Sequence, residues 1–420
     1  MHPNALLELC TDLLHRVLQF EHPADNVVSD FFRQHRTLGP RERHTLADTI
    51  FSVVRARSVF HHLAQSGQGE MERRLVLLGW QGNEGFLRAA LSPSETTWLE
   101  QVQKIDRTSL PARLQHNLPE WLAQRLQSQL EDAFWPLVHN LQQSAPLDLR
   151  VNVLKAKREE ARSLFQEAGI EAAPTPFSPW GLRVQGKPAL HKQEVFLSGQ
   201  VEIQDEGSQI LSWLMQAKRG EMVVDFCAGA GGKTLALGAT MRNTGRLYAF
   251  DTSGHRLASL KPRLARSGLS NVYPVQIAHE RDDRIKRLAG KIDRVLVDAP
   301  CSGLGTLRRN PDLKWRQSPE SVQELRHKQL AILNSAARLL KPGGRLIYAT
   351  CSLLQEENED VVQTFNNSEI GRNFQPTQVA QVLASLGCAT PEQLVKGDYL
   401  RLWPHIHQTD GFFAAIWHKS

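Results

Sequence analysis

The stretch that decides the fold is Met222–Thr234, which reads MVVDFCAGAGGKT. A mostly apolar run leads into a turn with glycines at positions 229, 231 and 232, and a helical pattern follows. A buried strand that enters a glycine-rich turn and then a helix is typical of a doubly wound α/β sheet, where the backbone of the turn approaches a ligand closely. The stretch therefore predicts a parallel sheet with a ligand site at this turn.

The sequence on both sides of this turn alternates between strand and helix patterns. Strands are predicted over 222–227, 246–250, 272–277, 294–297 and 346–348, and helices after Gly232 and over 257–266, 285–288 and 322–340. Buried strands joined by helices indicate a doubly wound, Rossmann-like sheet. Two final strands over 399–403 and 412–417 flank a turn at 409–411, which predicts an antiparallel hairpin at the sheet edge.

Two regions with other patterns precede this sheet. Residues 1–143 carry apolar residues at helical spacing, as in Leu46, Ile50 and Val53, and predict an all-helical domain. Residues 144–203 combine a strand over 147–154, a helix over 158–168 and a strand over 181–184, which predicts a small α/β module. The sheet domain then takes up residues 204–420.

Composition limits the class of protein. With 420 residues, 41% of them hydrophobic and 22% charged, the chain is typical of globular proteins and not of disordered or fibrous ones. No apolar run is long enough for a membrane span, and Glu8 and Asp12 lie where a signal peptide is apolar, so we expect a cytoplasmic protein without membrane contact. The net charge of +6 is compatible with a polyanionic partner such as RNA.

The cysteines are few and scattered. There are five, and none form a C-x-x-C pair, so we expect neither a disulfide framework nor a structural metal. Cys10, Cys227 and Cys388 take the ordinary interpretation of a buried structural cysteine, although the backbone of Cys227 is placed to touch a ligand at the glycine turn.

Two familiar nucleotide-binding patterns do not fit the glycine turn. A phosphate-binding P-loop requires glycine at position 227, where this chain has cysteine, and the spacing G-x-G-x-x-G is absent. A nucleoside-binding turn remains, with Asp251 at the end of the second strand placed to accept hydrogen bonds from ribose hydroxyls. An adenosyl sulfonium, which has no phosphate, suits this arrangement, and a turn that serves packing alone is the alternative.

Two other cysteines follow two of the predicted strands. The strand over 294–297 runs into Asp298 and Cys301, and the strand over 346–348 runs towards Cys351. Because parallel strands share one carboxyl edge, these three side chains are expected to meet beside the glycine turn. A thiolate near a methyl donor indicates chemistry on a pyrimidine, whose carbon becomes nucleophilic once a thiol adds to the neighbouring ring carbon. A second group then removes the ring proton, and a carboxylic acid holds the ring.

Several motifs, taken together, resemble those of the RsmB/NOP/Sun RNA cytosine-5 methyltransferases over about residues 145–420. They are the turn at 227–234, Asp298–Cys301, residues 308–315 (RRNPDLKW), Thr350–Ser352 followed by Glu357–Glu359, residues 204–208 (QDEGS) and residues 410–413 (DGFF). The helical region, mainly residues 31–57, is similar to the NusB-like RNA-binding domain of the bacterial ribosomal RNA branch. The resemblance implies S-adenosylmethionine as cofactor and RNA, above all ribosomal RNA, as the partner. We also expect a monomer without a metal.

The resemblance also implies roles for single residues. Cys351 becomes the nucleophile that adds to carbon 6 of cytosine, Cys301 assists release of the product, Asp298 contacts the ring and Lys233 reaches into the active site. The implied cofactor-binding residues are Cys227, Ala228, Gly229, Ala230, Gly231, Gly232, Lys233, Asp251 and Asp298.

The chain departs from the family pattern at two positions. Ala230 stands where the family usually has proline, which should loosen the turn without removing its backbone donors. His279 stands where an acidic residue commonly contacts the adenine amine, and Asp282 and Asp283 are alternatives for that contact.

Two basic stretches are candidates for RNA contact. In the first, residues 255–294, a solvated helix face is the simpler interpretation. In the second, residues 305–316 after Cys301, we expect the basic residues and Trp315 to hold a strand whose target base is flipped out.

Three other functions are open to the same fold. Transfer RNA is an alternative substrate for the same chemistry. A catalytically silent RNA-binding factor in ribosome assembly is disfavoured because such a protein has no need to keep both Cys301 and Cys351 with Asp298. A nucleotide-dependent oxidoreductase is disfavoured because the G-x-G-x-x-G turn is absent.

Overall fold

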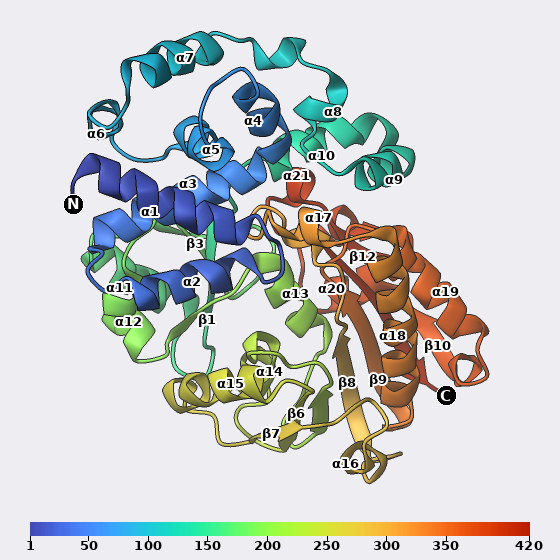
Figure 1. The fold of residues 1–420 in the computed structure, drawn as a ribbon. Helices are drawn as coiled ribbons and strands as arrows, with labels where there is room; N and C mark the ends of the chain where they lie inside the picture. Colours follow the sequence, from blue (N-terminus) through green and yellow to red (C-terminus); the bar gives the residue numbers. More distant parts are fainter. The chain divides into compact units, whose positions relative to one another are not determined.

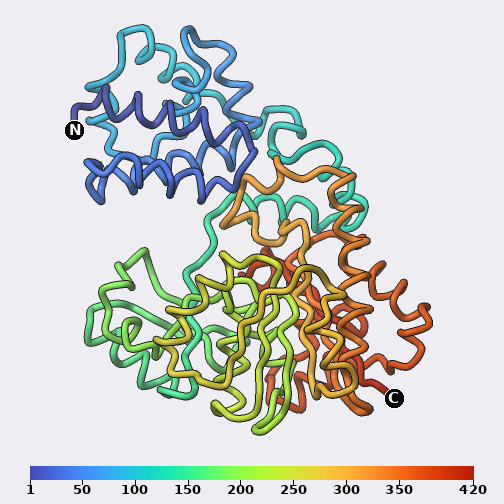
Figure 2. The backbone as a smooth tube through the Cα atoms, turned by 60° about the horizontal axis from the view of Figure 1, so that its bottom comes forward, coloured from blue at the N-terminus to red at the C-terminus, as the bar shows by residue number.

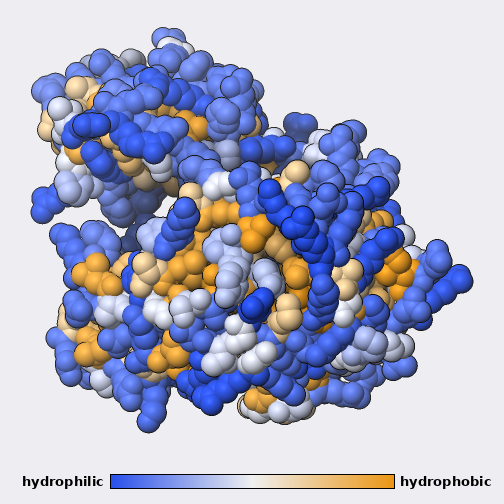
Figure 3. All heavy atoms as spheres, turned by 90° about the horizontal axis from the view of Figure 1, so that it is seen from below, coloured by the Kyte–Doolittle hydropathy of each residue, from blue (hydrophilic) through white to orange (hydrophobic).

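The computed structural model describes all 420 residues, and the chain divides into two compact units (Figures 1 and 2). The first contains residues 1–144 and 306–319, and the second contains residues 145–305 and 320–420. None of the helices has the length and apolarity that crossing a bilayer requires. In the view from below, hydrophilic residues surround apolar atoms that gather towards the middle of the visible face (Figure 3).

The first unit is helical. Its helices are α1 (Pro3–Val17), α2 (Ala24–Gln34), α3 (Pro40–Arg55), α4 (Arg57–Ala64), α5 (Met71–Gly79), α6 (Glu84–Arg88), α7 (Pro93–Gln103), α8 (Ala112–Gln115), α9 (Glu120–Leu130), α10 (Phe134–Leu141) and, from the later segment, α17 (Leu313–Arg316). Local signals set their ends, since Ser92 and Glu95 form a capping box before α7. Apolar residues at helical spacing, such as Leu46, Ile50 and Val53, are fully buried in one core.

The second unit begins with a small antiparallel sheet in the order β2-β3-β1-β4. Its elements are β1 (Leu147–Val151), α11 (Arg158–Glu167), β2 (Ala172–Pro174), β3 (Gly181–Val184), α12 (Glu194–Leu197) and β4 (Val201–Ile203). The sheet and α11 share a core that contains Leu149, Phe165 and Leu182. Strand β1 is shorter than predicted because Asn152 turns away and its side chain donates to the carbonyls of Gly199 and Ser267.

The main sheet has nine strands, and the doubly wound α/β fold is confirmed. The order is β11-β12-β13-β9-β8-β5-β6-β7, with β10 paired to β13. The strands are β5 (Met222–Asp225), β6 (Arg246–Asp251), β7 (Val272–Gln276), β8 (Ile292–Asp298), β9 (Leu340–Thr350), β10 (Phe374–Thr377), β11 (Val395–Lys396), β12 (Tyr399–Leu402) and β13 (Phe412–Lys419). Strands β7, β6, β5, β8 and β9 run parallel, and the order reverses between β5 and β8. Ligands bind at such a reversal, beyond the carboxyl ends of the strands.

Helices cover both faces of this sheet. They are α13 (Glu206–Leu214), α14 (Gly232–Thr240), α15 (Gly254–Ser267), α16 (Asp283–Lys286), α18 (Pro319–Ala337), α19 (Glu359–Asn367), α20 (Val379–Ser385) and α21 (Pro404–His407). Helices α18 and α19 share one core with the sheet, as Leu333 and Phe365 show. Helices α13, α14 and α20 share the other, as Ile210, Leu237 and Val382 show.

The predicted hairpin at the sheet edge differs from the structure. Strands β12 and β13 do pair antiparallel, but β13 lies inside the sheet because β9 pairs with its other side. The connection also holds the helix α21 in addition to a turn. The edge position belongs to β11, which is only two residues long and gives little periodic signal in the sequence.

Candidate active site

The turn after β5 is shaped by two glycines with left-handed backbone. Gly229 has φ +57° and Gly231 has φ +84°. A Cβ built on Gly231 would lie 2.1 Å from Cδ1 of the buried Leu260, whereas a Cβ on Gly229 would meet nothing within 4 Å. The Gly231 amide donates to the Ala228 carbonyl at 2.8 Å, which closes the turn. Position 231 therefore requires glycine for both conformation and space.

Asp251 joins this turn to the next strand. It ends β6, and its two carboxylate oxygens accept the amides of Gly229 at 2.8 Å and Ser253 at 2.7 Å. A carboxylate oxygen has capacity for more than one hydrogen bond, so Asp251 still has acceptor positions for a ribose. The sequence prediction placed Asp251 beside the turn, and the structure brings the two together.

Cys301 and Cys351 meet at the ends of β8 and β9. These strands run parallel and in register, with Asp298 opposite Ala349, and the Ala299 amide donates to the Ala349 carbonyl. The Sγ atoms of Cys301 and Cys351 are 3.4 Å apart. The hydrogen bond with Cys351 and burial together raise the pKa of the Cys301 thiol well above its usual range. Cys227, at the turn, also has a raised pKa because of burial and the nearby Asp298.

Lys233 reaches the same place from the first turn of α14. Its Nζ is 2.7 Å from Oδ2 of Asp298 and lies 5.6 Å from the centre of the Phe412 ring. Burial by itself would lower the pKa of Lys233, but the charges of Asp298 and Cys351 outweigh burial and raise it. The ammonium form is therefore favoured beside the two thiols.

A buried side chain that the sequence did not assign holds both cysteine loops. The carboxylate of Glu357 accepts the Ser302 amide at 2.8 Å, the Ser302 hydroxyl and the Ser352 hydroxyl, and it accepts from Gln329 at 3.0 Å. Ser302 and Ser352 directly follow the two cysteines. Asn358 adds a bond to the Ser352 carbonyl at 3.0 Å. The motif at 357–359 was visible in the sequence, but its partners follow only from the register of β8 and β9.

These groups line one cavity of about 900 Å³. Two groups of residues line it. The first group is the turn at 227–230 with Asp251, His279 and Glu280, and the second is Asp298, Cys301 and Cys351. The cavity thus places a glycine cradle and a ribose acceptor beside two thiols and a Lys–Asp pair.

Comparison with known proteins identifies the family. A model described as 16S rRNA methyltransferase RsmB/F matches residues 212–418, and an RsmF/B-like ferredoxin-like domain model matches residues 118–191, which include β1 to β3. The ribosomal RNA small subunit methyltransferase B of Salmonella paratyphi B is 33% identical and the match covers 89% of this chain and 94% of that protein. The chain belongs to the RsmB/F family of rRNA methyltransferases.

Two further similarities agree with this membership. A probable ribosomal RNA small subunit methyltransferase B from Synechocystis is 32% identical over 318 residues, which are 75% of this chain and 70% of that protein. The crystal structure of a methyltransferase homolog protein from Pyrococcus horikoshii has a TM-score of 0.61 and 28% identity, and covers 75% of this chain and 100% of that one. Membership in the RsmB/F family implies S-adenosylmethionine-dependent methylation of RNA.

The RsmB/F cavity suits the methyl donor. The glycine turn, in which a Cβ at position 231 would contact Leu260, gives a ligand close access to the backbone. The carboxylate of Asp251 lies beside this turn, where it suits the ribose hydroxyls of an adenosyl group. His279 and Glu280 line the cavity, whereas Asp282 accepts the amides of Ala278 and Arg284 and caps α16. Asp283 pairs with Lys286 on the surface.

Two basic residues of the second stretch are buried, contrary to expectation. Arg308 and Lys314 are 3% and 4% exposed, and Lys314 donates to the Arg55 carbonyl at 2.8 Å. The Trp315 indole donates to the Val54 carbonyl, and Arg57 lies 5.1 Å above its ring. The prediction that these residues hold an RNA strand is wrong for Arg308 and Lys314, because a phosphate contact needs exposure that helices α3 and α4 remove.

Proposed function

We propose that this protein transfers a methyl group from S-adenosylmethionine to carbon 5 of a cytidine in small-subunit ribosomal RNA, through a covalent adduct with Cys351. The observation that carries the proposal is the pair of thiols 3.4 Å apart at the ends of adjacent strands, in the cavity that also contains the glycine turn and Asp251. Two thiols in one methyltransferase cavity suit a reaction that needs both an adduct former and a group that helps to resolve the adduct.

The reaction starts with the nucleophile. Cys351 Sγ forms a bond to carbon 6 of the cytosine, and the electron density gained at carbon 5 makes that atom nucleophilic. S-adenosylmethionine, when bound, supplies an electrophilic methyl group on its sulfonium. Carbon 5 takes this methyl group, and S-adenosylhomocysteine is the leaving group. A water molecule then takes the proton from carbon 5, the electron pair of that C–H bond restores the double bond between carbons 5 and 6, and the bond from carbon 6 to Sγ breaks, which frees Cys351 as a thiolate.

The contacts of the two thiols support this division of roles. Because the pKa of Cys301 is raised, Cys301 stays a thiol and donates its S–H to Cys351. A thiolate at Cys351 thereby gains a hydrogen bond and lies near the ammonium of Lys233. Cys301 is in contact with the adduct-forming atom, which suits a role in release of the methylated product.

The remaining residues hold the two substrates. We assign Asp298, fixed by Lys233 at 2.7 Å, to the cytosine ring and to the donor beside it. We assign the donor to Cys227, Ala228, Gly229 and Ala230, which line the cavity, and to the adjacent Gly231 and Gly232. Lys233, Asp251 and Asp298 complete the assigned set.

Two cysteine variants test the mechanism. We expect Cys351→Ala to abolish methyl transfer, because no adduct forms, and Cys301→Ala to accumulate a covalent protein–RNA complex, because release is impaired. The readout is a band of reduced mobility in denaturing gels with labelled RNA. Cys388→Ala, which removes a thiol after α20, serves as the matched control and should methylate normally. Normal product release by Cys301→Ala would contradict its role.

The substrate is tested separately. Labelled S-adenosylmethionine is offered with ribosomal RNA and with transfer RNA from cells that lack the protein, and the modified base is mapped by bisulfite sequencing. We expect 5-methylcytosine in the small-subunit ribosomal RNA. If only the transfer RNA is labelled, the proposed substrate is wrong, whereas the proposed reaction at carbon 5 of cytidine still holds.

A further inference from the structure

The glycine turn is also held from outside the sheet. Arg263, on α15, donates from Nη1 to the Ala230 carbonyl at 2.5 Å. Leu260, one helical turn earlier, fills the space beneath Gly231. Helix α15 therefore contacts two adjacent residues of the turn through side chains on one face.

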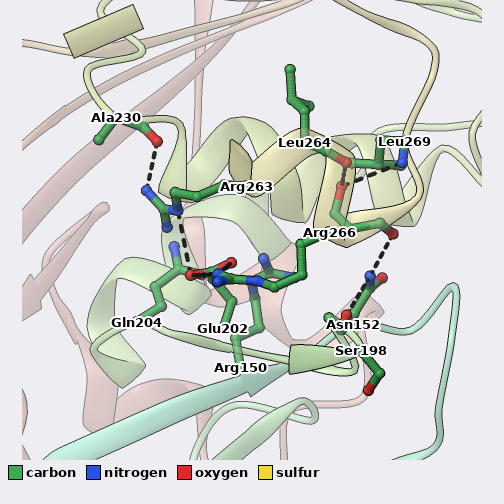
Figure 4. Close-up of polar contacts among 12 residues, drawn as sticks. Arg150, Asn152, Ser198, Glu202, Gln204, Ala230, Arg263, Leu264, Arg266 and Leu269 are labelled. Atoms are coloured by element: carbon green, nitrogen blue, oxygen red, sulfur yellow. Dashed lines mark hydrogen bonds and ion pairs between the residues drawn. The ribbon is translucent and has the colours of Figure 1, made fainter. Parts of the chain in front are cut away.

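Arg263 is itself oriented by the small sheet. Its Nε lies 3.3 Å from Oε1 of Glu202, a residue of β4 that is only 8% exposed. Figure 4 shows Arg263 between the carbonyl of Ala230 and the carboxylate of Glu202. Arg266 also binds Glu202, at 2.7 and 2.9 Å, and Arg150 lies opposite Glu202 in the register of β1 and β4.

The charges make Glu202 the centre of this cluster. Burial lowers the pKa of Arg150 to about 10, and the nearby charges of Glu202 and Arg263 act on it in opposite directions. One carboxylate therefore faces three guanidinium groups, and its negative charge attracts Arg263. The guanidinium of Arg263 has several N–H donors, so it can bind Glu202 and the Ala230 carbonyl at the same time.

The peptide that Arg263 contacts lies in the most glycine-rich part of the turn. Ala230 lies between two glycines with left-handed backbone, and neither glycine resists rotation of the flanking peptides. A carbonyl fixed in such a loop aligns the neighbouring amides, and this preorganisation lowers the entropy lost when a ligand is bound.

We propose that Arg263 and Glu202 are positioning residues for the methyl donor, through which the small β1–β4 sheet sets the affinity of the turn for S-adenosylmethionine. The inference rests on the proposed function, because it takes the turn at 227–232 as the donor site. It adds that the small sheet is part of the donor site although none of its residues lines the cavity.

The test measures donor binding and kinetics on the full chain. By calorimetry with S-adenosylmethionine and no RNA, we expect Arg263→Ala to raise Kd about tenfold, the size of effect of one charge-assisted hydrogen bond. KM for the donor should rise by a similar factor, while kcat and KM for RNA change less than about twofold. This split separates a positioning role from general destabilisation, which lowers the active fraction and hence kcat.

Further variants keep the test decisive. Arg263→Lys, which keeps the charge but not the fork, should give a Kd between those of wild type and Arg263→Ala, and it serves if the alanine variant does not fold. Glu202→Gln should weaken donor binding alone but add little in the Arg263→Ala background, because both act through one contact. Arg266→Ala is the matched control, since Arg266 binds the same Glu202 and stacks on Phe196 without touching the turn.

The outcomes distinguish the inference from the proposed function. Asp251→Ala should lose donor binding if the turn is the donor site. Loss with Asp251→Ala but an unchanged Kd with Arg263→Ala would overturn the inference alone. Normal binding by Asp251→Ala would overturn the donor site and the inference with it. An increase in KM for RNA without a change in donor Kd would make Arg263 an RNA contact instead, which also overturns the inference.

Discussion

The turn at residues 227–232, which we propose as the donor turn, and the two cysteine loops line one cavity but are held in different ways. The cysteine loops are tied from within by Glu357, which is fully buried and accepts hydrogen bonds from Ser302, Ser352 and Gln329. The donor turn is held partly from outside by Arg263, whose side chain is 21% exposed. Breaking a buried hydrogen-bond network costs much free energy, so such a network holds its residues in one geometry. A partly exposed contact contributes less free energy, so its residues can move more easily.

The difference matches what each part must do. In the proposed reaction the sulfur of Cys351 and the cytosine must meet within a few tenths of an ångström, so the cysteine loops need a rigid support. The donor turn must take up a ligand and release it in every cycle, so a weaker support is sufficient. We therefore expect changes around the cysteines to act on kcat and changes around the turn to act on donor affinity.

The largest effect is expected from Glu357→Gln. The side-chain NH2 of glutamine is a donor, and every group around position 357 is also a donor, so one hydrogen bond is lost. We expect the loops of Cys301 and Cys351 to shift as a result. We expect kcat to fall about 100-fold with little change in KM for the donor, and the free energy of unfolding to fall by about 3 kcal/mol. Steady-state kinetics and thermal unfolding measure both.

Glu356→Gln controls for the change of charge, because it alters the neighbouring, partly exposed residue of the same turn. An increase in KM for the donor with unchanged kcat in Glu357→Gln would break the comparison, because it would place the support of the donor turn at Glu357.

A second prediction concerns the one fully buried carboxyl next to the donor turn. Asp225 ends β5, accepts the Thr234 hydroxyl at 2.7 Å, and has its pKa raised to about 7 by burial. The folded protein thus binds more protons here than the unfolded chain, so Asp225 makes stability fall as pH rises from about 4 to about 7.

Asp225→Asn keeps an acceptor for Thr234 and removes the titration. Relative to wild type, the variant should gain stability between pH 4 and 8, by on the order of 4 kcal/mol at most. Thermal unfolding of both proteins at several pH values measures the difference. Parallel curves across this range would show that Asp225 does not titrate on unfolding. The carboxyl at the end of β5 would then add no pH-dependent cost beside the donor turn.

The parts of the site that could be predicted from sequence are those whose signal is local. The glycine turn follows its strand directly, and Cys301 and Cys351 each follow a strand of the sheet, so topology alone brings them together. The partners of Glu357 could not be predicted, since Ser302 is 55 residues away and the contact depends on the register of β8 and β9. Lys314 looked like an RNA contact because charge is visible in a sequence and burial against Arg55 is not.

The smallest effect is expected within the turn itself, from two alanine substitutions that differ in one respect. Gly229 and Gly231 both have left-handed backbone, so alanine at either position costs about 1 kcal/mol of conformational energy. At Gly231 the new Cβ also strikes the buried Leu260, which raises the total to about 2 kcal/mol.

Thermal unfolding and donor titration of the two variants separate strain from packing. We expect Gly231→Ala to be less stable than Gly229→Ala and to bind the donor more weakly, because the new Cβ must displace the buried Leu260, which lies on α15 together with Arg263. Equal losses in the two variants would mean that α15 yields freely. The donor turn would then depend on its own backbone alone, and its support from outside the sheet would have no energetic weight.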